Sequence, residues 1–309
     1  MPYCVSTYYS SANSSTSASW QLSIPYILAF LLPGIVASYY EGTRSYHGMA
    51  TLWIGFAFRL GLLLTALFWT LDAADDGNWL PQIPSAYLKT TKVILAQIVL
   101  GTAFAAGYST YTWCAPLLQI QSRPSRAQDA RKIWDKGDLV LSRDGASALT
   151  VQGYSNLHGS RYALLLTVWT LGITVLQKPM GQAAMGILLW QIFCLLEIVA
   201  VNGLADKVVV GPTVLALLGG YHFFKTGHQA TLSSIQWESA FVPLKGVRYP
   251  WSPLLVVLNT FGPQILCAVA VPATVLWKQP ARKKGLLGAV AGAVATHLLV
   301  LATVGVATT

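Results

Sequence analysis

Charged residues are scarce in this sequence: Asp, Glu, Lys and Arg make up 10% of its 309 residues, whereas 54% are hydrophobic. Soluble domains carry roughly 25% charged residues, so this composition excludes an ordinary water-soluble enzyme. Cysteine is also sparse: the four cysteines include no pair at metal-ligand spacing, and three lie in apolar segments, as buried free cysteines do. The sequence therefore predicts an all-α, polytopic membrane bundle.

Known catalytic motifs are missing as well. The chain has no HExxH zinc motif, no G-x-S-x-G nucleophile elbow, no glycine-rich phosphate loop and no Asp and His cluster for paired metals. His222, His228 and Glu238 do not have the spacing of a metal site. Ser233 or Ser234 beside His228 lacks the strained elbow of a serine nucleophile. We therefore expect no catalytic residue and no metal or other cofactor in this chain.

Apolar segments are abundant, and about 20 residues are needed to cross roughly 30 Å of hydrocarbon. Residues 1–19 precede these segments and are expected to form a polar, Ser-rich, disordered tail. The seventh segment is long enough to break, and Pro263 and Pro272 predict a bend in it. The eight predicted spans are residues 20–38, 49–71, 93–120, 162–176, 183–201, 208–224, 251–277 and 285–306.

The basic residues predict the orientation of these spans. With eight spans, thirteen Lys and Arg lie on one side of the membrane and six on the other, while Arg59 lies inside a span. The positive-inside rule places the 121–161 loop and the 278–284 turn in the cytoplasm. The 225–250 segment then faces the lumen or the exterior. This asymmetry accounts for the net charge of +9, so no nucleic-acid partner is expected.

The 121–161 loop is the one sizeable polar insertion, with seven basic and four acidic residues. About 40 residues are too few for an independent catalytic domain. Its stretches DLVLSRDG and ALTVQGY are expected to form a short hairpin or an irregular cover. We interpret the loop as a solvated connector in preference to a contact with anionic lipid headgroups.

The stretch KTGHQATLSSIQWESAF, residues 225–241, mixes His, Gln, Ser, Trp and Glu densely. As a helix from about Thr231 it would be polar on two opposite faces, which suits a short helix or re-entrant segment wedged among other helices. Its polar groups would either shape a cavity at the membrane edge for a substrate or clamp this element in place. We call the candidate residues the polar wedge: His228, Gln229, Ser233, Ser234, Gln236, Trp237 and Glu238.

Five polar residues within spans are a second candidate set, because polar groups in a bilayer are costly unless they are paired or functional. Arg59 and Glu197 would pair with each other or mark a substrate path. Asn259 and Gln97 would join such a polar core. His297 is predicted to be a neutral, hydrogen-bonded residue between helices.

The run from Tyr221 to Phe241, above all GHQATLSSIQW, resembles a signature of the glycosylphosphatidylinositol (GPI) ethanolamine phosphate transferases. It is most similar to the type 3 enzymes, which modify the third mannose, whereas type 2 enzymes carry a different polar sequence here. PWSP (250–253) and NTFGP (259–263) are also similar to the family. The resemblance is to the C-terminal transmembrane region. It implies that the family's phosphatase-like catalytic domain, with its Thr nucleophile, is missing from this chain.

The resemblance further implies a multi-pass protein of the endoplasmic reticulum membrane that takes part in GPI-anchor assembly. The family transfers ethanolamine phosphate to a mannose of the GPI precursor. Implied partners are the GPI lipid intermediate, the membrane lipids and a small multi-span subunit that stabilises the transferase. The divalent metal, zinc, would bind in the missing domain. The lumenal side predicted for residues 225–250 is also the side of the mannoses.

Two other functions stay open from the sequence. Broken helices together with Arg59 and Glu197 also suit a polytopic transporter of lipids or small molecules. A non-catalytic structural subunit would need the same bundle but would bind no lipid substrate.

Overall fold

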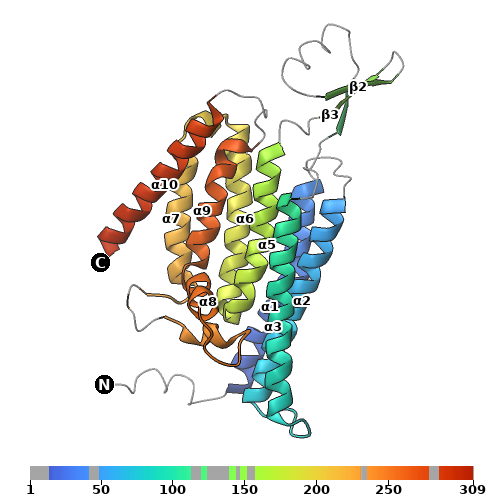
Figure 1. The fold of residues 1–309 in the computed structure, drawn as a ribbon, viewed down its shortest axis with the longest axis vertical. Helices are drawn as coiled ribbons and strands as arrows, with labels where there is room; N and C mark the ends of the chain where they lie inside the picture. The colour runs from blue at the N-terminus through green and yellow to red at the C-terminus, as the bar shows by residue number, and fades with distance from the viewer. Residues whose placement is uncertain are drawn as a thin grey trace.

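The structure is a computed structural model of the 309-residue chain. It describes residues 14–41, 49–112, 120–123, 139–143, 147–151, 157–229, 231, 235–277 and 285–308. Most of these residues form a bundle whose long helices run roughly side by side (Figure 1). The predicted helical membrane bundle is confirmed.

Each of the eight predicted apolar segments coincides at least in part with a helix, and the seventh is divided in two at Phe261. The first helix begins at Ser14, so residues 14–19 are helical and do not belong to a disordered tail. The third begins at Ser85 rather than at residue 93 and ends at Thr112. The helices are α1 (Ser14–Glu41), α2 (Met49–Asp76), α3 (Ser85–Thr112), α5 (Leu157–Leu176), α6 (Pro179–Val201), α7 (Val210–Lys225), α8 (Trp251–Thr260), α9 (Gly262–Leu276) and α10 (Leu286–Thr308), with 3-10 turns η2 (Leu204–Asp206) and η4 (Trp237–Phe241).

By length and composition, four of the described helical stretches are long and apolar enough to cross a membrane. The pair α8 and α9, bent by 79°, would be a fifth span if the two helices cross together. Within the described residues α1 and α5 contribute shorter apolar stretches, Gln21–Ile35 and Arg161–Leu176. The predicted number of eight spans is therefore not confirmed. The four long stretches are Phe56–Asp76, Ser85–Tyr108, Pro179–Val201 and Leu286–Thr303.

A small antiparallel sheet forms within the polar insertion. Its strands are β1 (Ile120–Arg123), β2 (Leu139–Arg143) and β3 (Ser147–Val151), in the order β1-β3-β2. Strands β2 and β3 pair with Leu141 opposite Leu149, and they coincide with the DLVLSRDG and ALTVQGY stretches. The predicted hairpin is confirmed, and β1 adds a third strand to it.

Helices α5, α6 and α9 lie at the centre of the bundle and carry much of its core. Leu188, Leu189 and Ile192 of α6 are fully buried. Small residues let neighbouring helices come close: a Cβ at Gly61 of α2 would lie 2.4 Å from Leu171 Cδ2 of α5. These helices are apolar all round rather than amphipathic, as membrane spans are, and α6 also exposes apolar residues such as Ile187 and Trp190.

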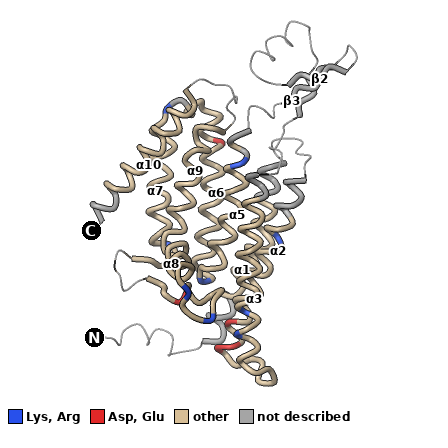
Figure 2. The backbone as a smooth tube through the Cα atoms, viewed as in Figure 1, with Lys and Arg blue, Asp and Glu red and all other residues tan. Residues whose placement is uncertain are grey.

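Charged residues are gathered mainly towards the two ends of the bundle (Figure 2). The end of α9 and the start of α10 lie at the upper end in Figure 1, as does the start of α5. The described part of the 225–250 segment lies at the lower end, with α8. The segment predicted to be lumenal is thus at the opposite end from the helix termini that flank the two predicted cytoplasmic loops.

Candidate functional site

The candidate site is centred on the break between α8 and α9. Helix α8 ends at Thr260, and α9 begins at Gly262 with Pro263 in its first turn. Proline fits there because the first turn of a helix does not use its N–H groups within the helix. A Cβ at Gly262 would lie 2.5 Å from Ile173 Cγ2, so only glycine lets the break pack this closely on α5.

The break leaves the backbone carbonyl of Asn259 without a helical donor. In a continuous helix this carbonyl would accept a hydrogen bond from the N–H of residue 263, and proline has none. The side chain of Gln177, just after α5, donates to it instead, with 2.6 Å between Nε2 and the oxygen. Both residues are fully buried. Gln177 therefore replaces a missing main-chain hydrogen bond at the bend.

The same amide network joins three parts of the chain. Gln182 Nε2 on α6 donates to the Gln177 carbonyl at 3.1 Å. Asn259 Nδ2 donates to Gln236 Oε1 at 3.3 Å. Because Gln236 belongs to the polar wedge, these bonds connect the α5–α6 turn and the α8–α9 break with the wedge.

The helix predicted from Thr231 is not seen in the described residues of this stretch, since Thr231, Ile235 and Gln236 are not helical. The chain turns at Gly227, whose φ of +88° favours glycine. Among the residues described after this turn and before α8, the helical segment is the short 3-10 turn η4. The Ser239 hydroxyl donates to the Gln236 carbonyl at 2.8 Å, a local bond that competes with a regular helix. The polar groups therefore reach separate tertiary partners rather than two helix faces.

His228 is the deeply buried member of the wedge, with 1% of its surface exposed. Thr226 Oγ1 lies 3.1 Å and 2.9 Å from the carbonyls of His222 and Phe223, so its one proton is donated to them. It must accept from His228 Nδ1, 3.0 Å away, which leaves Nε2 as an acceptor. The imidazole also stacks on Phe223. Burial lowers the pKa of His228, so its ring is neutral at pH 7.

Polar contacts to neighbouring helices hold the segment after the wedge. Gln97 Nε2 of α3 donates to the Pro243 carbonyl at 2.8 Å, and Lys245 Nζ donates to Thr90 Oγ1 at 3.2 Å. Gln97, which was expected to join an intramembrane polar core, thus anchors the 225–250 segment. Glu238 forms an exposed ion pair with Lys178 at 3.4 Å. These contacts fix the segment across the lower end of the bundle.

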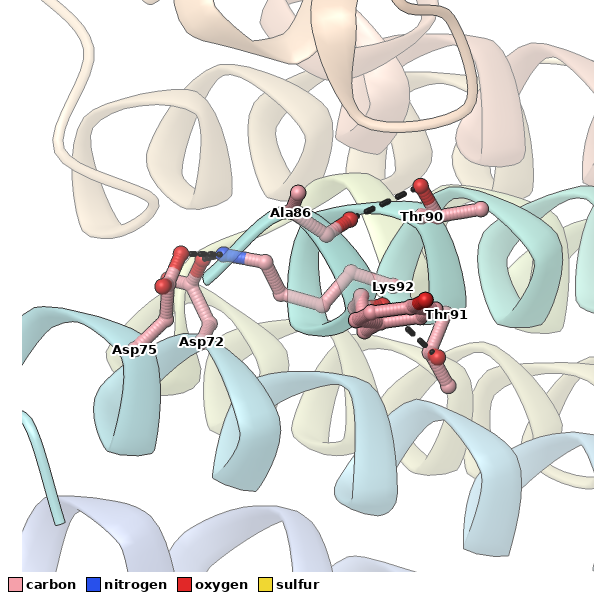
Figure 3. A network of polar contacts seen from close by, with 7 residues as sticks. Asp72, Asp75, Ala86, Thr90, Thr91 and Lys92 are labelled. Carbon is pink, nitrogen blue, oxygen red and sulfur yellow. Dashed lines mark hydrogen bonds and ion pairs between the residues drawn. The ribbon is translucent and has the colours of Figure 1, made fainter. Parts of the chain in front are cut away.

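The α2–α3 hairpin beside this segment is held by a cluster of charges. Lys92 Nζ lies 2.8 Å from Asp72 Oδ1 and 3.2 Å from Asp75 Oδ2 (Figure 3). Lys92 and Asp75 are mostly buried, with 12% and 8% of their side chains exposed. The cluster therefore supports the α3 surface on which the 225–250 segment is anchored.

The remaining wedge residues face outward or fall outside the description. Trp237 is 62% exposed, and Gln229 and Glu238 are exposed as well. Tyr249 and Trp251 are exposed near Trp237 in the chain, an arrangement typical of aromatic residues at headgroup depth. Ser233 and Ser234 lie outside the described residues.

The intramembrane candidates do not form one centre. Arg59 is exposed on α2 and forms no ion pair with Glu197, which accepts a hydrogen bond from Trp277 Nε1 at 3.0 Å. His297 is buried, and its Nδ1 lies 3.1 Å from the Pro212 carbonyl, so it bridges α10 and α7. Of these four residues, Asn259 is the one that the structure brings to the wedge.

His222, His228 and Glu238, the residues considered as metal ligands, do not come together as a site either. His222 Nε2 lies 2.7 Å from Gln191 Oε1, His228 bonds Thr226, and Glu238 pairs with Lys178. Within the part of the chain that the structure describes, no group of three or more His, Cys, Asp or Glu could hold a metal ion.

Sequence reasoning missed Gln177 and Gln182, which surround the break. Both lie between the predicted spans 162–176 and 183–201, where a polar residue is readily interpreted as part of a loop. One signal was present: a proline four residues after Asn259 leaves that carbonyl unpaired in any helix. A buried donor was therefore required, although the sequence did not show which residue would supply it.

Comparison with known proteins shows relatives along most of this chain. GPI ethanolamine phosphate transferase 3 of Saccharomyces cerevisiae is 32% identical over 284 residues, which are 90% of this chain and 25% of the relative. The protein of the same name from Eremothecium gossypii is 29% identical over 281 residues, again 90% of this chain and 25% of the relative. The mouse catalytic subunit of GPI ethanolamine phosphate transferase 3 is 36% identical over 271 residues, 76% of this chain and 24% of the relative.

This chain spans about a quarter of the length of these relatives, and the match is to their C-terminal quarter. The resemblance read from residues 221–241 is thereby confirmed, including its assignment to type 3. No protein-family model matches the chain. No solved structure matches it either.

Proposed function

We propose that this chain is the membrane module of a GPI ethanolamine phosphate transferase. It positions the lipid-linked substrate for transfer of ethanolamine phosphate to a mannose of the GPI precursor in the endoplasmic reticulum membrane, and it carries no catalytic residue. The observation that carries this proposal is the 32% identity to the yeast transferase over 90% of the chain. The transfer chemistry and its zinc are assigned to a catalytic domain outside this sequence.

The lower end of the bundle is the proposed place of contact with substrate. A bent helix pair with buried amides is a common form of ligand site in membrane proteins. Exposed Trp237 would stack on a sugar or lie at headgroup depth, next to half-buried Gln236 and its buried partner Asn259. The distribution of basic residues favours a lumenal location of this end, where the mannoses lie.

The proposal includes two further partners. The membrane lipids surround the bundle, whose outer helices expose large apolar residues such as Leu287 and Leu299 on α10. A small multi-span subunit of the transferase would pack against the module and stabilise it. The charge pattern gives no reason to add a nucleic-acid partner.

A chimeric transferase tests the proposal. The C-terminal quarter of the S. cerevisiae relative is replaced by this chain, in cells that lack their own copy, and GPI precursors are followed by inositol labelling. We expect the chimera to restore ethanolamine phosphate addition. The proposal would be overturned if the chimera is present at normal abundance in the correct membrane but leaves the precursor unmodified.

Single substitutions distinguish a wedge that positions substrate from a wedge that only holds the segment in place. Gln236→Ala in the chimera is expected to slow transfer at unchanged abundance, since it removes the contact with Asn259 from the lower end. Asn202→Ala is the matched control, because Asn202 is exposed after α6 and bonds only its own helix terminus, through Ile198. If Gln236→Ala lowers abundance alone, the wedge is a structural clamp. Lipid or solute transport by the reconstituted chain alone would favour the transporter alternative.

A further inference from the structure

The connection between α2 and α3 exposes large apolar side chains at the lower end of the bundle. In Figure 1 this connection projects further down than α8 and the described part of the 225–250 segment. Its large apolar residues, which we call the apolar tip, have between 39% and 69% of their surface exposed. They are Trp79, Leu80, Ile83 and Tyr87. The apolar tip is thus separate from the candidate site described above.

Backbone hydrogen bonds at the end of α2 give the first part of the tip a defined conformation. Asn78 has a φ of +49°, the left-handed conformation in which many helices end. Its N–H donates to the Asp75 carbonyl at 3.4 Å, and the N–H of Trp79 donates to the Ala74 carbonyl at 3.0 Å. This pair of bonds is the Schellman pattern. Trp79 also covers Gly77, where a Cβ would collide with its Nε1 atom.

The second part of the tip is equally constrained. The N–H of Ile83 donates to the Leu80 carbonyl at 3.0 Å, and the N–H of Tyr87 donates to the Pro84 carbonyl at 2.9 Å. Behind the tip, the Lys92 cluster joins α2 to α3 (Figure 3). A surface that is ordered before binding loses less entropy when a partner binds. The tip is therefore suited to recognition.

The Lys92 cluster also limits how deep in a membrane the tip can lie. Asp72 of this cluster follows the apolar segment of α2, and charged groups avoid the hydrocarbon core. Helix α3 rises about 10 Å between Ser85 and Lys92. The headgroup layer is roughly 5–8 Å thick on each side of the hydrocarbon. The tip therefore lies at the outer edge of the headgroups or beyond them, where acyl chains do not cover it.

The size of the tip indicates which kind of partner would cover it. Clustered apolar side chains that face water mark protein interaction sites. At roughly 200 Å² for each large side chain, the exposed part of the tip amounts to about 400 Å². A stable interface between separate molecules buries roughly 800 Å² on each partner, so the tip is too small to hold a second copy. It suffices for a domain of the same polypeptide, because covalent linkage supplies a high effective concentration.

We propose that the apolar tip docks the water-soluble catalytic domain of the transferase onto the lower end of the bundle. The inference rests on the proposed function, which assigns the transfer chemistry to a domain outside this sequence, and it names the surface that this domain contacts. The match covers 25% of the S. cerevisiae relative, which leaves ample length for such a domain. Trp79 and Ile83 enter an apolar recess of the domain, and exposed Asp76 and Lys89 form the polar rim.

Photo-crosslinking in the chimeric transferase tests this contact. The photoreactive amino acid p-benzoylphenylalanine replaces Tyr87, and a protease site is placed at the junction between the relative's part and this chain. After irradiation and cleavage, we expect the two fragments to stay joined, with the cross-link mapped to the catalytic domain by mass spectrometry. Phe104 is the matched control position, since it is an exposed aromatic residue further along α3. A probe there should not reach the catalytic domain.

Other products of the probe at position 87 would overturn the inference. Cross-links to lipid would place the tip within the headgroup layer. Cross-linked dimers of the chimera would assign the tip to a second copy. Absence of any product would show that nothing covers the tip.

A charge placed in the tip tests its apolar character. Ile83→Lys should lower the cross-linking yield at position 87 roughly tenfold, because the contact then loses a buried apolar side chain. The unfolding temperature should not change, since Ile83 is exposed. Val247→Lys is the control, at an exposed apolar position of the 225–250 segment. Full cross-linking in Ile83→Lys, or an equal loss in Val247→Lys, would overturn the inference.

The two proposals can fail separately. A cross-link from position 87 to the catalytic domain in a chimera that adds no ethanolamine phosphate rejects the proposed function and keeps the docking surface. A chimera that transfers ethanolamine phosphate but gives no such cross-link rejects the docking surface and keeps the proposed function.

Discussion

The side-chain amide of Gln177 donates to the backbone carbonyl of Asn259 across 82 residues of sequence, at 2.6 Å. This bond replaces the one that Pro263 cannot donate. It joins the end of α5 to the break between α8 and α9, so the bend and the candidate site depend on the same contact.

Substitution of Gln177 should destabilise the bundle. Gln177→Leu keeps the approximate volume but leaves the Asn259 carbonyl buried without a donor, which costs about 1–3 kcal/mol. Thermal unfolding in nanodiscs measures the loss as a lower unfolding temperature. Asn202→Leu, which removes an exposed contact near the end of α6, serves as the control and should change the temperature little. Equal effects of the two substitutions would show that the Gln177 bond does not stabilise the bend.

The Lys92 cluster predicts a strong coupling between charges. Lys92→Met removes the cation from Asp75, whose side chain is 8% exposed, and should lower the free energy of unfolding by about 2–4 kcal/mol. Adding Asp72→Asn and Asp75→Asn to Lys92→Met should recover much of that loss, because no buried charge is then left unpaired. A double-mutant cycle measures the coupling. Losses that simply add would contradict the pairing seen in Figure 3.

The pKa of His228 predicts a pH dependence. Burial lowers its pKa below the ordinary 6.5, so below that pH the unfolded chain takes up a proton that the folded chain resists. Stability contributed by the neutral ring is therefore complete above about pH 6.5 and is lost as the pH falls towards the folded-state pKa. One such group changes the unfolding free energy by at most about 1.4 kcal/mol per pH unit.

The measurement compares wild type with His228→Asn, which keeps a donor near the position of Nδ1 but cannot titrate. Unfolding temperatures recorded from pH 7.5 to pH 5 should fall less steeply for the variant. Parallel pH profiles would mean that His228 does not contribute to the pH dependence.

Much of the architecture could be predicted from composition and pattern alone. Scarce charge and apolar segments of bilayer length gave the helical bundle, and Pro263 predicted the bend. A hairpin was one of the two forms expected for the DLVLSRDG and ALTVQGY stretches of the polar loop. These features depend on local sequence, through hydrophobic length, proline geometry and strand patterning. The identity of the relatives was likewise readable in residues 221–241.

Which polar side chains bond each other could be known only from the tertiary structure. A helix polar on two faces was a reasonable prediction for the wedge, but Gly227 turns the chain, and Gln236 bonds Asn259 instead of a helical neighbour. Arg59 and Glu197 are both charged and within helices, yet packing gives Glu197 a tryptophan partner. The sequence alone determined that the polar groups exist and that the seventh segment bends at Pro263 or Pro272; the structure places the break at Pro263 and keeps Pro272 inside α9. Which groups meet at that break depends on contacts between residues far apart in the chain, and these become visible only once the helices are packed.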